Sequence, residues 1–202
     1  MDAAHPYADV IPGPRGRLLA TLVQLETPVT VRALGRHAGI SPQGALGLVN
    51  ELGDAGLVFA ERAGSALMVS LNREHLAAEP LVALVGLRGG LVQRLTDELR
   101  TWPDLAGAFL YGSTARGDGG RASDVDLLLV AEDTIDDIDW VEATDRLRER
   151  VQTWTGNDVQ IVEHTRRSFA RLVRSRNPLT SALQADGIPL LEGSRALLRG
   201  AA

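Results

Sequence analysis

In the first third of the chain, apolar residues recur every three or four positions, the spacing of one face of a helix. The pattern predicts three short helices, over residues 18–25, 31–38 and 41–55. Ser41-Pro42 marks the start of the third, because a serine cap followed by proline at the first helical position is a typical helix start. Two apolar runs, 57–60 and 66–71, surround the turn 62–65 and predict a β-hairpin.

Three helices followed by a hairpin resemble the winged helix-turn-helix family over about residues 14–75. The resemblance implies that 41–55 is the recognition helix and 57–71 the wing. Gln43 and Asn50 would then read adenine edges, and Arg62 would contact a phosphate. However, residues 1–75 carry 6 arginines against 7 acidic residues, and DNA binding favours a positive excess. A surface for dimerisation or for a partner protein therefore stays as the alternative.

Two segments flank this predicted domain. Residues 1–13 have no periodicity and are expected to form a flexible arm. Residues 76–102 are expected to form a connecting helix that starts after Pro80 and bends at Gly89-Gly90. This helix would serve as an interdomain hinge, as a dimer seam, or simply as the first helix of the second domain.

From residue 103 onward, short apolar runs replace the helical pattern and predict buried strands. The runs cover residues 106–111, 125–130 and 158–162, and a helical pattern over 138–154 separates the last two. This alternation indicates an α/β arrangement. The expected fold is therefore α+β or α/β. A helical domain at 14–75 would precede a second domain at 103–202, in which helices flank a small mixed sheet.

The stretch GSTARGDGGRASDVD, residues 112–126, joins the first two of these strands. Asp124 and Asp126 are two residues apart on a predicted strand, so their side chains face the same side. Adjacent carboxylates repel unless a cation lies between them, and Mg²⁺ (or Mn²⁺) prefers such oxygen ligands. The turn at Gly112 and Ser113, together with Arg116, offers amides, a hydroxyl and a positive charge to phosphate. The aspartate pair and the turn at Gly112 and Ser113 together predict a site for a magnesium-bound nucleoside triphosphate.

The longer stretch LYGSTARGDGGRASDVDLLLV closely resembles the signature of the polymerase-β-like nucleotidyltransferases. It is most similar to their minimal nucleotidyltransferase group, whose motif is Gly-Ser, ten residues, Asp-x-Asp. The resemblance covers about residues 90–192 and implies transfer of a nucleoside monophosphate, with AMP expected, to an acceptor hydroxyl. It implies that the triphosphate is held by Gly112 and Ser113, with Ser123 also fitting the motif, and that the metal is held by Asp124 and Asp126. The group includes antitoxins that adenylylate partner toxins.

One position departs from the family pattern. The family usually carries a third carboxylate in the middle of a later strand, and the matching residue here is Gln160. An amide ligates weakly and cannot act as a base. Asp158 lies two residues earlier on the same expected strand face and is the candidate replacement, so we take it as the third catalytic carboxylate. Nucleotide and metal binding are better supported than turnover.

Composition narrows the chemistry further. The chain has no cysteine, and all 21 of its basic residues are arginine. Disulfides, thiolate metal sites, a P-loop lysine and Schiff-base chemistry are therefore excluded. No apolar run reaches the roughly 18 residues of a membrane span, and the N-terminus lacks the order of a signal peptide. We therefore expect a cytoplasmic protein without membrane contact.

Three functions fit these features. The first is a nucleotidyltransferase that uses ATP or another NTP and modifies a protein, an RNA or a small molecule. The second is a DNA-binding regulator whose catalytically weak second domain senses a nucleotide. The third is an interaction module in which neither half is active, and the retained aspartate pair makes it the weakest. The acceptor, the operator and the oligomeric state, including a homodimer, stay open.

Overall fold

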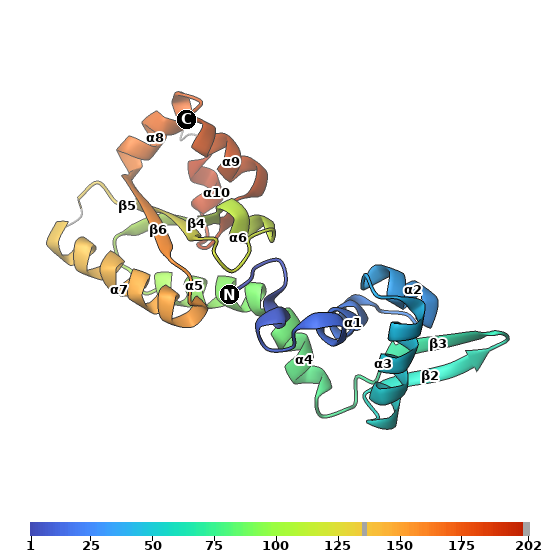
Figure 1. The fold of residues 1–202 in the computed structure, drawn as a ribbon. Helices are drawn as coiled ribbons and strands as arrows, with labels where there is room; N and C mark the ends of the chain where they lie inside the picture. Colours follow the sequence, from blue (N-terminus) through green and yellow to red (C-terminus); the bar gives the residue numbers. More distant parts are fainter. Residues whose placement is uncertain (135–136, 200–202) are drawn as a thin grey trace. The chain divides into compact units, whose positions relative to one another are not determined.

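The structure, a computed structural model, describes residues 1–134 and 137–199. The chain divides into two compact units (Figure 1). We call His5–Leu87 the helical unit, and Met1–Ala4 together with Arg88–Ala202 the sheet unit. Along the chain, the helical unit is thus inserted between Ala4 and Arg88. None of the helices in the described part combines the length and the apolar character that crossing a membrane requires.

The helical unit contains the three predicted helices and the hairpin. Its elements are a 3-10 helix (Pro6–Asp9), α1 (Gly13–Gln24), β1 (Val29–Thr30), α2 (Val31–His37), α3 (Pro42–Asp54), β2 (Val58–Ala63), β3 (Ala66–Leu71) and α4 (Ala78–Val85). Side-chain caps fix two helix starts, because Thr30 Oγ1 accepts from the Ala33 amide at 3.1 Å and Ser41 Oγ accepts from the Gly44 amide at 3.2 Å. The short strand β1 was not predicted, because two residues leave no periodic signal.

The three strands of the helical unit form an antiparallel sheet in the order β1-β3-β2. The hairpin is longer than expected. Ala63 pairs with Ala66, so the turn consists of Gly64 and Ser65 alone rather than residues 62–65. The helices and the sheet share one core, built from leucines and valines such as Leu18, Leu34 and Val49, all fully buried.

The sheet unit has α+β architecture, with a small mixed sheet flanked by helices, as expected from the sequence. Its elements are α5 (Leu87–Leu99, whose first residue belongs to the helical unit), β4 (Leu105–Tyr111), α6 (Gly112–Arg116), β5 (Val125–Ala131), α7 (Asp137–Thr155), β6 (Val159–Thr165), α8 (Arg166–Arg174), α9 (Pro178–Asp186), β7 (Ile188–Pro189) and α10 (Ser194–Leu197). The strand order is β6-β5-β4-β7, with β5 and β6 parallel and the other pairs antiparallel.

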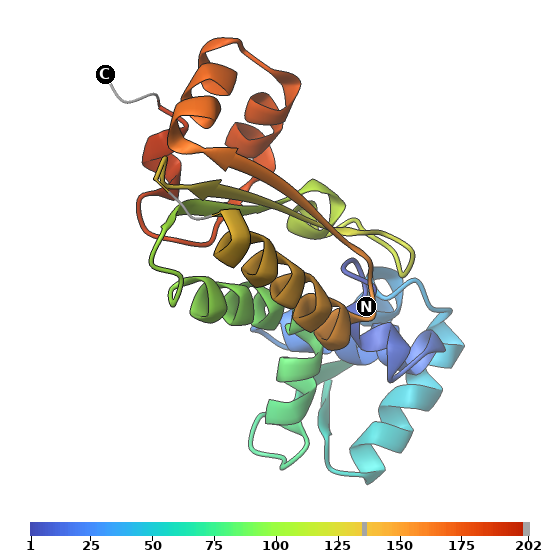
Figure 2. The same ribbon diagram turned by 90° about the vertical axis from the view of Figure 1, so that its left-hand side faces the viewer.

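Alternate residues of β5 face two different cores. Leu127 and Leu129 pack in the cluster that contains the apolar residues of α5 and α7. Leu128 and Val130 pack in a second cluster with residues of α8 and α9. Figure 2 shows the same layering, with α5 and α7 on one face of the sheet and α8 and α9 beyond the other. Asp126 has the same parity as Leu128, so it belongs to the α8 and α9 face.

The connecting segment 76–102 differs from its prediction. It is broken at Gly86, which ends α4, and α5 continues through Gly89-Gly90 without a break. Leu91, Leu95 and Leu99 of α5 are buried in the core of the sheet unit, so packing holds the glycine pair in the helix. The boundary between the two units therefore falls inside the segment, between residues 87 and 88.

The expected arm 1–13 is also divided differently. Residues 1–4 belong to the sheet unit, Pro6–Asp9 form a 3-10 helix, and α1 already starts at Gly13. Ala3 and Tyr7 are buried, at 6% and 8% exposed. The glycines and prolines of this segment hide these contacts from a search for apolar periodicity.

Candidate functional site

The turn after β4 is built around Gly112, where both the backbone conformation and the nearby Asp126 side chain favour glycine. Gly112 has a φ of +70°, in the left-handed region that favours glycine. A Cβ atom at this position would lie only 2.1 Å from Oδ2 of Asp126. Gly112 therefore lets the backbone approach the carboxylate of the neighbouring strand directly, at the point where β4 ends.

The segment 112–124, which we call the Gly-Ser turn, folds back on Ser113. The carbonyl oxygen of Ser113 accepts from the amides of Gly117, Asp118 and Gly119 at 2.9, 3.1 and 3.2 Å. A Cβ atom on Gly119 would lie 2.9 Å from Ser113 Oγ, so the turn also packs tightly over the hydroxyl side of the residue. These contacts give the Gly-Ser turn a defined shape.

Asp126 is the second residue of β5 and Asp124 directly precedes the strand, and both are partly buried. Asp126 pairs across the sheet with Tyr111 of β4. The backbone of Asp124 is held by the side chain of Thr114, whose Oγ1 donates to the Asp124 carbonyl at 3.1 Å. The motif therefore brings both carboxylates to the same end of the sheet as Gly112.

Charge repulsion is visible in the electrostatics of the pair. Burial raises the pKa of the Asp126 carboxyl above its ordinary value, and the neighbouring Asp124 raises it further, while Arg116 lowers it. The pKa of Tyr111 is also raised, first by burial and then by Asp126. Burial is the larger cause of both shifts and the neighbouring negative charge adds to it, and a bound cation would lower both pKa values.

The donor set fits a hard divalent cation. Two aspartate carboxylates supply the oxygen ligands that Mg²⁺ prefers, and Mg²⁺ sites commonly use one or two carboxylates with phosphate and water completing the shell. Within residues 1–134 and 137–199, no cluster of three or more His, Asp or Glu side chains is arranged to hold a metal. In a site with two carboxylates, a phosphate and water would complete the shell.

The other two residues expected to hold phosphate make local contacts. Arg116 lies at the end of α6, and its Nε donates to Asp118 Oδ2 at 3.1 Å. Ser123 Oγ accepts from the Gly120 amide at 3.0 Å, which shapes the far end of the Gly-Ser turn. The charge of Arg116 acts on Asp126, so the guanidinium lies within electrostatic range of the carboxylate pair.

Gln160 lies on β6 in register with Asp126 of the parallel strand β5. Residues paired in this way point to the same face, so the neutral amide of Gln160 stands beside the carboxylate pair and is exposed. Asp158 precedes β6, and its Oδ1 accepts from Gln152 Nε2 of α7 at 3.3 Å. Because α7 covers the other face of the sheet, this hydrogen bond counts against Asp158 as the third carboxylate.

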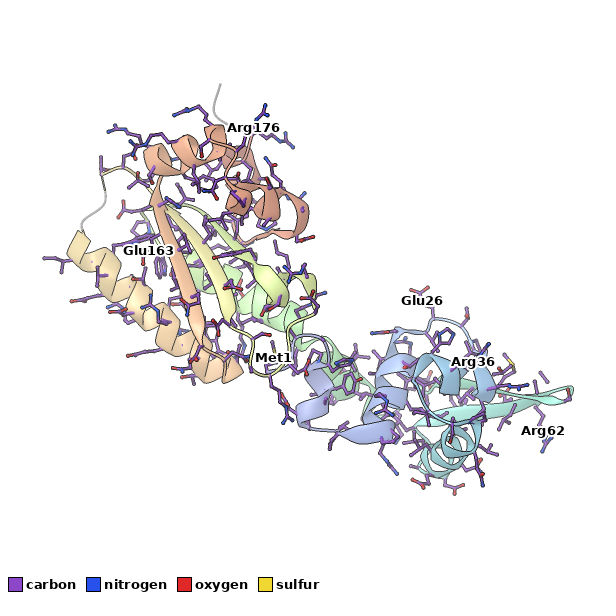
Figure 3. All side chains as sticks on the ribbon, turned by 45° about the horizontal axis from the view of Figure 1, so that its top comes forward. Met1, Glu26, Arg36, Arg62, Glu163 and Arg176 are labelled. Carbon is purple, nitrogen blue, oxygen red and sulfur yellow. The ribbon has the colours of Figure 1, made fainter. Side chains whose placement is uncertain are left out.

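The residues proposed to contact DNA all lie in the helical unit. Gln43 and Asn50 are exposed on α3 and, seven residues apart, lie on the same face of the helix. Arg62 projects from β2 of the hairpin (Figure 3). Next to Asn50, Glu51 is paired with Arg15 of α1. This pairing offsets one of the negative charges of α3.

The sequence analysis missed four residues at the site. They are Tyr111, opposite Asp126; Thr114, bonded to the Asp124 carbonyl; Asn157, bonded to the carbonyls of Arg121 and Ser123; and Arg88, bonded to the Ala115 carbonyl. Tyr111 had a usable signal, because it directly precedes Gly-Ser at the end of an apolar run. Arg88 and Asn157 are remote in sequence, and no local pattern marks them.

Comparison with known proteins gives one family. Residues 93–179 match the family described as polymerase beta, nucleotidyltransferase. Among solved structures, a toxin–antitoxin complex with AMP-PNP is 24% identical, with a TM-score of 0.38, over 54% of this chain and 81% of that one. The toxin–antitoxin pair MntA–HepT is 20% identical, with a TM-score of 0.34, over 55% and 80%. No curated protein matches.

Proposed function

We propose that the protein transfers a nucleoside monophosphate from a magnesium-bound triphosphate to an acceptor hydroxyl, because residues 93–179 match the family described as polymerase beta, nucleotidyltransferase. ATP is the expected donor, and the acceptor is on a protein, an RNA or a small molecule. The observation that carries this proposal is the close approach of Gly112 to the carboxylate of Asp126, next to Asp124. That approach joins a phosphate-binding turn to a metal-binding pair.

Each part of the site has a role in this reaction. Gly112 and Ser113 hold the triphosphate through backbone amides and the hydroxyl, and Ser123 keeps the Gly-Ser turn in shape. Arg116 adds positive charge once it leaves Asp118 for a phosphate. Asp124 and Asp126 hold Mg²⁺ (or Mn²⁺), which when bound neutralises the phosphates. Catalysis of this type depends mainly on positioning and charge stabilisation.

The weak point of the site is the activation of the acceptor. A carboxylate at the position of Gln160 would take the acceptor proton or hold a second metal ion, and an amide does neither well. Asp158 is bonded to α7 and is poorly placed to replace it. We therefore expect tight nucleotide binding together with slow transfer.

Replacing both metal-binding aspartates tests the proposal. Asp124→Asn with Asp126→Asn removes two charges at nearly constant shape. We expect the affinity for a non-hydrolysable ATP analogue with Mg²⁺, measured by calorimetry, to fall about 100-fold, a loss of roughly 3 kcal/mol. Transfer of label from radioactive NTPs to a component of a cell lysate should disappear in the same variant.

The matched control is Asp97→Asn, which removes an exposed acid on α5 outside the site. It should bind and transfer as the wild type does. Unchanged nucleotide binding by the double variant would refute the site. Intact binding without any labelled acceptor would favour the second candidate.

The second candidate is a DNA-binding regulator in which the sheet unit senses a nucleotide. The helical unit supports it, because helices followed by a hairpin, with strand order β1-β3-β2, are the arrangement of a winged helix. The neutral Gln160 beside Asp126 supports it as well. In this case Gln43 and Asn50 of α3 would face the major groove, with Arg62 on a phosphate.

Arg62→Ala tests the regulator. Loss of one phosphate contact should weaken binding to duplex DNA of random sequence and reduce the slope of log K against log salt by about 1. Arg62→Lys keeps the charge and should keep the slope. A wild-type protein whose DNA binding is absent or insensitive to salt would contradict the regulator.

A further inference from the structure

The residues of the sheet unit that adjoin its two peptide connections to the helical unit form hydrogen bonds with the Gly-Ser turn. The chain leaves the sheet unit after Ala4 and returns to it at Arg88. Residues on either side of the inserted helical unit, Ala3 and Ala4 before it and Arg88 after it, all bond to the segment between Ala115 and Gly119. This segment lies between Gly112-Ser113 and the aspartate pair.

Arg88 holds the middle of the turn. Its Nη1 donates to the carbonyl oxygen of Ala115 in α6 at 2.7 Å, and the side chain is partly buried. The guanidinium also lies against Gly117, where a Cβ atom would come within 3.0 Å of Nη1 and 3.1 Å of Cζ. A planar cation at the last carbonyls of a short helix fixes the end of that helix. Arg88 thereby sets the orientation of α6, which begins with Gly112 and Ser113.

The first connection holds the next part of the turn. The amides of Ala3 and Ala4 both donate to the carbonyl oxygen of Gly119, at 2.8 and 3.1 Å. Gly119 is buried and packs on Ser113 Oγ and Ser123 Cβ, so its position is tied to Ser113, which would hold the phosphates, and to Ser123, which shapes the turn. Movement of residues 3–4 would therefore move the backbone next to Ser113.

A third contact, from the side chain of Asn157, holds the C-terminal end of the Gly-Ser turn at Arg121 and Ser123. Asn157, 6% exposed, donates from Nδ2 to the carbonyls of Ser123 at 2.8 Å and of Arg121 at 3.2 Å. The same amide donates to the carbonyl of Met1 at 3.2 Å. The buried side chain of Asn157 therefore bonds both to Ser123, which precedes Asp124, and to Met1, at the start of the segment that leads to the first connection.

We propose that Arg88 and Ala3–Ala4 are positioning residues of the nucleotide site, and that through them the helical unit is coupled to nucleotide binding. The inference rests on the proposed function, because it requires the triphosphate to bind the Gly-Ser turn. Strain carried along the backbone from the helical unit enters the sheet unit at residues 4–5 and 87–88, and the residues next to both junctions bond to the turn. Linkage makes the effect reciprocal, so a nucleotide that orders the turn also tightens both junctions.

Arg88→Ala in the full chain tests the positioning role. We expect about tenfold weaker binding of a non-hydrolysable ATP analogue with Mg²⁺ and faster amide exchange at Gly117–Gly119 in the free protein, with the melting temperature of the sheet unit little changed. Arg88→Lys keeps one donor for the Ala115 carbonyl and should recover part of the affinity. The matched control is Arg100→Ala, directly after the end of the same helix, which removes an exposed arginine paired with Asp97 and should change neither readout.

Amide exchange in the wild type tests the coupling without any variant. Saturation with the ATP analogue and Mg²⁺ should slow exchange of the Ala3 and Ala4 amides severalfold, because their acceptor at Gly119 becomes ordered. If the amide exchange rates of Ala3 and Ala4 are the same with and without bound nucleotide, the coupling is overturned. Unchanged affinity and unchanged exchange in Arg88→Ala would overturn the positioning role.

These readouts separate the inference from the proposed function. A wild type that binds no nucleotide would overturn the proposed function and, with it, the coupling. Exchange at Gly117–Gly119 is measured without nucleotide, so it still decides whether Arg88 holds the turn. A wild type that binds nucleotide but transfers no label would overturn the transfer reaction and leave the coupling supported by the exchange data.

Discussion

Gly112→Ala is expected to abolish nucleotide transfer and to weaken nucleotide binding about 100-fold or more. Alanine at this position would have to adopt a φ near +70°, which costs about 1–2 kcal/mol for a residue with a Cβ atom. The new methyl group would also lie 2.1 Å from Oδ2 of Asp126, well inside van der Waals contact. Either the carboxylate leaves its place or the start of α6 shifts, and both changes separate the turn from the metal pair.

Calorimetry with a non-hydrolysable ATP analogue and Mg²⁺ measures this effect, and labelled transfer measures its consequence. Gly120→Ala is the matched control, because it adds the same methyl group to the same turn. A Cβ atom at 120 would have no neighbour within 4 Å, and the backbone there is not left-handed. We expect this control to stay within about twofold of the wild type, since the substitution touches nothing. Equal loss in both variants would show that the turn tolerates no alanine and that Asp126 is not the cause.

Gln160→Asp is expected to raise the rate of transfer about 100-fold or more. The side chain at 160 lies in parallel register with Asp126 and is exposed at the same face. A carboxylate there would accept the proton of the acceptor hydroxyl, a contribution typically worth about 10²–10⁴ in rate. The added negative charge should also strengthen binding of the metal and destabilise the metal-free protein.

Single-turnover transfer from labelled NTP at saturating Mg²⁺ separates this gain from a change in affinity. Gln160→Asn is the control, because it shortens the side chain as aspartate does and adds no charge. We expect Gln160→Asn to remain at or below the wild-type rate. If Gln160→Asp is no faster than Gln160→Asn, the low activity of the site has another cause and Gln160 does not stand at the third carboxylate position.

Local sequence was enough to determine the elements that matter most for the site. Apolar runs predicted β4, β5 and β6, and helical spacing predicted α7, because these segments bury one face or both and must be apolar there. The motif from Gly112 to Asp126 was also readable, since its glycine, serine and aspartates are close in sequence. The residues expected to bind phosphate and metal all lie within the fifteen residues 112–126, and the structure adds the close approach of Gly112 to Asp126.

Errors in the sequence analysis arose where packing overrides local preference. Gly89-Gly90 favours a break, yet α5 runs through it because Leu91, Leu95 and Leu99 are buried against the sheet. The catalytic role of Asp158 stays a prediction, and two observations count against it: β6 starts only at Val159, and the Asp158 carboxylate accepts a hydrogen bond from Gln152 of α7. Because Asp158 lies outside β6, the alternation of side chains along the strand does not determine where its carboxylate points.

The tertiary structure alone decided which distant residues hold the Gly-Ser turn. Arg88, Asn157 and the amides of Ala3 and Ala4 reach it from distant parts of the chain, and Ala3 lies 116 positions before its partner Gly119 (119 − 3). None of these residues belongs to a motif, because a hydrogen bond to a backbone carbonyl demands only a donor at the right place in space. The sequence by itself determined the chemistry of the site, and the fold determined what holds the site in position.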